Sequence, residues 1–98
     1  MASVSYKQIH DDLVEIVESV TAPAQELTLD SVLYVDLLDI LEIIIEFEKQ
    51  YLIHDTHQIR LLLSEWASED EEFERDIMDT MTLGVLENLI INARPVRK

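Results

Sequence analysis

The clearest pattern in the sequence is a repeat of apolar residues three or four positions apart near the N-terminus. The residues with this spacing are Ile9, Leu13, Ile16, Val17 and Val20. One face of a helix presents such a set, so the spacing predicts a helix. Ser5 and Gln8 precede the apolar run with the spacing of a capping box, which predicts that the helix begins there. We expect the helix to end near Thr21.

A loop is predicted after this helix, because Pro23 disfavours helical backbone in the residue before it. The loop covers residues 24–32, and we expect Leu27 and Leu29 to pack back against the core.

The second predicted helix, residues 35–52, is apolar over most of its surface. Its polar side chains lie three or four residues apart on one narrow face, and they are Asp36, Asp39, Glu42, Glu46 and Lys49. A helix with so broad an apolar surface is surrounded by its neighbours on most sides. We therefore expect the central helix of the fold, with one acidic edge in water.

Weaker apolar patterns follow in residues 52–79. A short helix is predicted over 59–66, and residues 68–71 have the composition of a helix N-cap followed by acids. Trp66 is expected either to cover the open end of the core or to anchor a partner.

The last predicted helix starts at Thr80 or Thr82 and ends before Pro95. Residues 94–98 are predicted to be a frayed, disordered basic tail.

Composition agrees with an all-α fold. The chain has one glycine and two prolines, which are too few for the turns of a many-stranded sheet. Its 98 residues are enough for a single domain, residues 1–98. It has no cysteine, which excludes disulfides, thiolate zinc sites and a cysteine nucleophile.

Charge points to a class of partner. The chain has 21 acidic and 7 basic side chains, a formal net charge of −14, and three of the basic residues fall within the last five positions. Such a field repels nucleic acid and anionic membranes, and it speeds encounters with basic protein surfaces. We therefore expect a basic protein partner and no nucleic-acid binding.

Hydropathy and the N-terminus predict a cytoplasmic protein. The most apolar stretch, residues 40–47, is interrupted by Glu42 and Glu46, so no membrane insertion is expected. The N-terminus has no apolar targeting run. We expect a monomer or a weak dimer.

Three stretches of the sequence carry a family resemblance. Residues 24–37 read Ala-Gln-Glu-Leu-Thr-Leu-Asp-Ser-Val-Leu-Tyr-Val-Asp-Leu, residues 38–43 read Leu-Asp-Ile-Leu-Glu-Ile, and residues 80–90 begin Thr-Met-Thr-Leu. They resemble the first loop, the second helix and the last helix of acyl carrier proteins. The resemblance implies a bundle of four main helices, here with an extra helical insertion between helices two and three, and a role in fatty-acid or polyketide biosynthesis.

The sequence departs from this family at the attachment serine. Members carry Gly-x-Asp-Ser between the first two stretches, and that serine holds 4′-phosphopantetheine. Here Asp36 and Leu37 are followed directly by Leu38 and Asp39, so that Leu37 takes the place of the serine when the helix is aligned without a gap. The resemblance thus implies a carrier-like module without a normal phosphopantetheine arm, and no cofactor is expected.

Ser31 is the only alternative attachment site. Asp30-Ser31-Val32 precedes Val35, Asp36 and Leu37 in the order of the family's Asp-Ser-Leu-x-x-Val-Glu-Leu motif. A functional carrier modified at Ser31 therefore stays an alternative. The other interpretation is that Asp30 or Ser31 caps the second helix, as these residue types commonly do.

The resemblance also implies a docking surface. Carrier proteins present acids of the second helix to arginine and lysine patches on their enzymes, and the predicted partner-binding residues here are Asp36, Asp39, Glu42, Glu46 and Glu48. The alternative interpretation is an ordinary solvated helix edge. A second functional hypothesis is an acidic immunity protein, antitoxin or nucleic-acid mimic that inhibits a basic enzyme through the run from Glu69 to Asp76.

Catalytic and metal-binding signals are weak. Acid pairs such as Glu15 with Glu18 arise by chance in so acidic a chain, and no strand-turn-helix serine motif is present. His54 and His57 could meet on one helical turn, yet a zinc site needs three or four ligands. We expect neither an enzyme nor a metal site.

Overall fold

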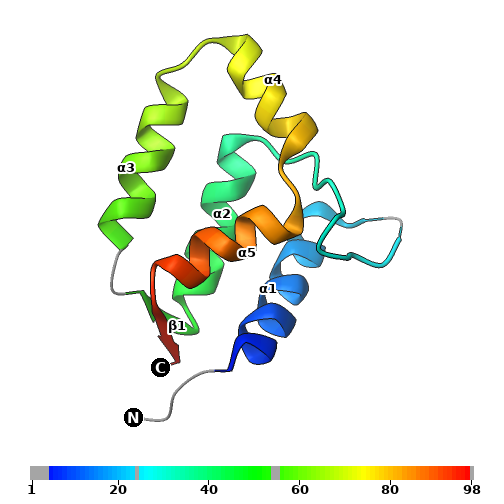
Figure 1. Cartoon of the computed structure of the whole chain (residues 1–98), viewed down its shortest axis with the longest axis vertical. Coiled ribbons are helices and arrows are strands. Elements are labelled where there is room, and N and C mark those ends of the chain that lie inside the picture. The colour runs from blue at the N-terminus through cyan, green and yellow to red at the C-terminus, as the bar shows by residue number, and fades with distance from the viewer. Residues whose placement is uncertain (1–4, 24, 54–55, 98) are drawn as a thin grey trace.

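The computed structural model describes residues 5–23, 25–53 and 56–97, with the side chains of 56–58 and 97 left out. The described residues form five helices and a two-stranded antiparallel sheet (Figure 1). In chain order these elements are α1 (Tyr6–Thr21), α2 (Leu37–Glu48), β1 (Tyr51–Ile53), α3 (Thr56–Ala67), α4 (Glu71–Thr80), α5 (Leu83–Asn92) and β2 (Pro95–Arg97). The all-α prediction is confirmed, and residues 52–79 supply both α3 and most of α4.

The core lies among α1, α2 and α5, where α1 packs against both of the other helices. Its fully buried aliphatic side chains are Leu13, Val17, Val35, Ile40, Ile43, Ile44, Leu83, Leu86 and Ile90. Burial of each such side chain stabilises the fold by about 1.5–3 kcal/mol. The apolar spacings of the sequence therefore placed the inner faces of α1 and α5 correctly.

The N-cap of α2 is Asp36. Asp36 Oδ1 accepts a hydrogen bond from the Asp39 amide at 2.8 Å, and the Asp39 side chain accepts one from the Asp36 amide at 3.5 Å, which completes a capping box. The prediction that Asp30 or Ser31 caps α2 is wrong. The helix begins later than expected because residues near Ser31 bond to another part of the chain.

That other part is the start of α5. Leu33 donates its amide to the Met81 carbonyl at 2.9 Å, and Leu83 donates to the Ser31 carbonyl at 3.1 Å. Gly84 donates to the Leu29 carbonyl at 2.9 Å, and a Cβ at Gly84 would lie 3.1 Å from that oxygen, so glycine permits the close approach. These hydrogen bonds hold the loop against the start of α5.

The loop leucines behave differently from one another. Leu27 packs against the core as expected, but Leu29 is exposed. The backbone of Leu29 is used for pairing with α5, and its side chain points outward as a result.

The end of α2 and the C-terminal tail both differ from the predictions. The helix stops at Glu48, and Tyr51–Ile53 instead forms β1, which pairs with β2 in the register Leu52 opposite Val96. The tail is therefore a strand at residues 95–97, where fraying was predicted. Tyr51 is buried and stacks on Phe47 with a ring separation of 4.3 Å, which fixes β1 against the core.

Helices α3 and α4 lead away from α2 and return to α5 as an arch, at the upper part of Figure 1. The side chain of Asp70 caps α4 by accepting from the Phe73 amide at 3.0 Å, within the predicted cap segment. Trp66 is partly buried against the core, together with Leu63 and Phe73. The core-covering interpretation of Trp66 is thus the one that its packing favours.

No helix among the described residues is both long enough and apolar enough to cross a membrane.

Candidate docking site

The outward side of α2 combines apolar and acidic side chains. Leu38, Glu42 and Ile45 follow one another at spacings of four and three residues, so they lie on one side of the helix, which we call the outer face of α2. Leu38 is 75% exposed and Ile45 is 42% exposed. The expectation of a helix surrounded on most sides is therefore wrong for this side, where two aliphatic side chains meet solvent.

The acid in the middle of this face is unpaired. Glu42 is exposed and makes no hydrogen bond or ion pair with the described part of the chain. Its carboxylate is therefore available to a cation from outside. Leu38 and Ile45 flank it along the helix.

The other predicted partner-binding acids have roles inside the molecule. Asp36 and Asp39 form the capping box. Glu46 pairs with Lys49 at 2.7 Å. Each of these contacts reduces how freely the carboxylate can meet a partner, although exposed pairs of this kind are weak and exchange readily.

Glu48 lies on a different side of α2 from Glu42. One oxygen of Glu48 accepts from Arg60 of α3 at 3.2 Å, and the other oxygen is buried and has no hydrogen-bond partner among the described residues. Glu48 therefore links α2 to α3. Of the five predicted acids, Asp36, Asp39, Glu42 and Glu46 follow one another at helical spacing from the N-cap of α2 onward, and Glu48 lies apart from them against α3.

Ser31 lies in the loop before α2. Its side-chain oxygen accepts from the Thr28 amide at 2.9 Å and lies 3.2 Å from the Thr28 hydroxyl. These contacts close a local turn. Ser31 is also separated from the N-cap of α2 by four residues. Leu37, which takes the place of the attachment serine when the helix is aligned without a gap, is the first residue of α2.

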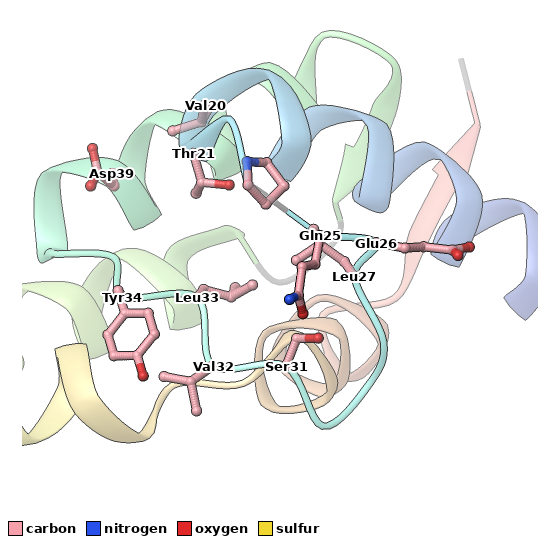
Figure 2. Close-up of a pocket in the computed structure, with 11 residues that line it drawn as sticks. Val20, Thr21, Gln25, Glu26, Leu27, Ser31, Val32, Leu33, Tyr34 and Asp39 are labelled. Atoms are coloured by element: carbon pink, nitrogen blue, oxygen red, sulfur yellow. The ribbon is translucent and has the colours of Figure 1, made fainter.

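A groove of about 690 Å³ separates the end of α1 from the loop and the start of α2 (Figure 2). Val20 and Thr21 line it from α1, Ser31 and Tyr34 from the loop, and Asp39 from α2. No sequence pattern predicted this groove, although its lining residues all lie within residues 20–39.

Tyr34 has an unusual backbone conformation in the wall of this groove. Its φ is 52°, in the left-handed region, and its side chain is 68% exposed. A bulky residue rarely adopts this conformation, which costs about 1–3 kcal/mol.

The three histidines of the chain are at positions 10, 54 and 57. His54 and the side chain of His57 lie outside the described residues, and among the residues that the structure describes no group of three or more His, Asp or Glu is arranged to hold a metal. His10 of α1 is part-buried, and its ring nitrogen lies 2.9 Å from Glu87.

No protein-family model, no curated protein and no solved structure matches this chain. The resemblance to acyl carrier proteins therefore depends on the residue motifs themselves.

Proposed function

We propose that this chain is an acidic, acyl-carrier-like module that docks on a basic partner protein through the outer face of α2. The observation that carries the proposal is the position of unpaired Glu42 between exposed Leu38 and Ile45. One carboxylate provides attraction to a cation, and two aliphatic side chains provide apolar area to bury.

The two kinds of side chain have different tasks in docking. The net charge of −14 attracts a basic surface over a distance and raises the rate of encounter. Leu38 and Ile45 then supply affinity, since the centre of an interface gains most from apolar side chains that lose water. An ordinary solvated helix edge would not need exposed aliphatics at both of these positions.

The proposed module works without a normal phosphopantetheine arm. Leu37 offers no hydroxyl, and the Ser31 oxygen is engaged by Thr28 in a loop that is bonded to α5. Intact mass spectrometry after incubation with coenzyme A and a broad-specificity phosphopantetheinyl transferase tests this. No mass gain is expected, and a gain that disappears in Ser31→Ala would establish the alternative of a functional carrier.

Affinity capture with identified partners tests the docking surface. The immobilised protein is expected to retain basic acyl-transfer or synthase enzymes, and the double variant Leu38→Ser, Glu42→Lys is expected to lose them. Glu72→Lys on α4 is the matched control, because it changes the charge equally at another exposed acid. Equal loss in both variants would attribute retention to net charge and refute the docking surface.

A second candidate function is inhibition of a basic enzyme. It is favoured by the exposure of every acid from Glu69 to Asp76 on and before α4. An immunity protein, antitoxin or nucleic-acid mimic would capture a nuclease or a DNA-binding protein. It would lose that partner on Glu71→Lys with Glu74→Lys and keep it on Glu42→Lys.

A further inference from the structure

The outer face of α2 continues to Lys49. Lys49 follows Glu42 by seven residues and keeps helical backbone angles, with φ −66° and ψ −27°, so the two side chains lie on the same side of the helix. The Lys49 side chain is 65% exposed. This face therefore carries an acid, an aliphatic residue and a base, in the order Glu42, Ile45 and Lys49.

An acid and a base placed in this way make the face complementary to itself. A two-fold axis that crosses α2 midway between positions 42 and 49 puts Glu42 opposite the second copy's Lys49, and Lys49 opposite the second copy's Glu42, when the two helices run antiparallel. Ile45 lies beside that midpoint, so the two Ile45 side chains meet at the axis. One apolar contact is thereby flanked by two ion pairs.

Both charged groups are available for these pairs. Glu42 makes no hydrogen bond or ion pair with the described part of the chain. Lys49 contacts Glu46 at 2.7 Å, but this pair is exposed, and an ammonium group has three donors. Lys49 can therefore keep its contact with Glu46 and also donate to the second copy's Glu42.

Two other properties of the chain limit how tightly two copies associate. Each copy carries a net charge of −14, so the copies repel each other at long range. A contact between two single helices is also smaller than the area of about 1,200 Å² that stable interfaces bury. The association is therefore weak and reversible.

We propose that two copies of this chain associate through the outer face of α2 as an antiparallel, two-fold symmetric dimer when no partner is bound. The inference goes beyond the proposed function and does not depend on it. A basic partner covers the same face, so partner binding separates the two copies. Until then the dimer removes Ile45 from water.

Sedimentation equilibrium of the purified full chain, at concentrations from about 10 μM to about 1 mM, tests the proposal by measuring the dissociation constant of the dimer. Added salt is expected to strengthen the dimer, because it screens the long-range repulsion more than the close ion pairs. A chain that stays monomeric at about 1 mM at physiological ionic strength overturns the proposal.

Charge reversal tests the register of the dimer. Glu42→Lys and Lys49→Glu each place like charges opposite one another at two symmetric points, so each is expected to weaken the dimer by about tenfold or more. Net charge alone predicts otherwise, since Glu42→Lys lowers the repulsion between copies and Lys49→Glu raises it. A dimer strengthened by Glu42→Lys therefore overturns the proposal. Circular dichroism checks that both variants keep their helices.

Restoring the ion pairs is expected to restore the dimer. The double variant Glu42→Lys, Lys49→Glu keeps the net charge of −14 and exchanges the two partners, so its affinity is expected to return to within about threefold of the original. An equimolar mixture of the two single variants is expected to form a heterodimer for the same reason. Failure of both the double variant and the mixture to recover dimerisation overturns the proposal.

The apolar contact has a matched control on α3. Ile45 is 42% exposed and Leu61 is 47% exposed, but Leu61 is not on the outer face of α2. Ile45→Ser is expected to weaken the dimer by about tenfold, and Leu61→Ser by less than about twofold. Equal effects of the two substitutions would place the contact elsewhere and overturn the proposal.

The dimer and the docking of a basic partner can fail separately. Lys49→Glu is expected to lose the dimer and to keep the partner, because it adds an acid to the docking surface. If the original chain is monomeric but loses its identified partner on Leu38→Ser with Glu42→Lys, the dimer proposal is wrong and the docking surface stands. A dimer with this register and no loss of partner in that variant gives the opposite result.

Discussion

His10 Nδ1 lies 2.9 Å from Glu87 Oε1, and this contact joins α1 to α5. Glu87 is only 8% exposed, and it is the one buried charged residue in the described part of the chain. A buried carboxylate needs a hydrogen-bond donor, because it has lost most of its water. His10 is the donor that the fold provides.

His10→Ala is expected to lower the free energy of unfolding by about 1–3 kcal/mol, because it leaves the Glu87 carboxylate without its donor. The double variant His10→Ala, Glu87→Leu removes both polar groups and is expected to recover much of the loss. Urea unfolding at neutral pH measures both. A double variant less stable than His10→Ala would show that Glu87 has another partner.

Asp36→Ala is expected to destabilise the protein by about 1 kcal/mol, since Asp36 caps α2. Asp36→Ser retains a capping oxygen and is expected to lose less. Asp30→Ala is the control in the exposed loop, with an expected change within about 0.5 kcal/mol. If Asp30→Ala proved to be the more damaging change in thermal unfolding, the observed start of α2 would be wrong.

The isoleucines at 43 and 45 are expected to respond differently to truncation. Ile43 is fully buried, so Ile43→Ala creates a cavity and should cost about 2–5 kcal/mol. Ile45 is exposed on the outer face of α2, so Ile45→Ala should cost less than about 1 kcal/mol while weakening partner binding. Chemical unfolding and partner affinity measured on the same two samples distinguish a core position from a docking position.

Val96→Pro is expected to lower stability by about 1–2 kcal/mol, because proline lacks the amide that a strand needs and fits poorly in β2. Val96→Thr keeps the β-branched shape and the amide, and it serves as the control. Hydrogen exchange should show faster exchange in residues 51–53 for the proline variant alone. Identical exchange in both variants would mean that the pairing of β1 with β2 is absent in solution.

Much of the fold could be predicted from the sequence. Apolar residues at helical spacing identified α1, α2 and α5, and the inner side of α1 and α5, because a helix buries one face whichever partner covers it. Ser5 at the start of α1 and Thr82 before α5 act as N-caps within the predicted segments, since capping depends on residues only three positions away. The net charge, and with it the expectation of a basic partner, also followed from composition.

Contacts between distant residues were decided by the tertiary structure. The pairing of residues 29–33 with 81–84 moved the start of α2 to Asp36, and the pairing of β1 with β2 turned the basic tail into a strand. The burial of Glu87 against His10 has the same origin. The spacing of apolar residues predicts that a helix must bury one face against another element. Which element covers that face depends on packing in three dimensions.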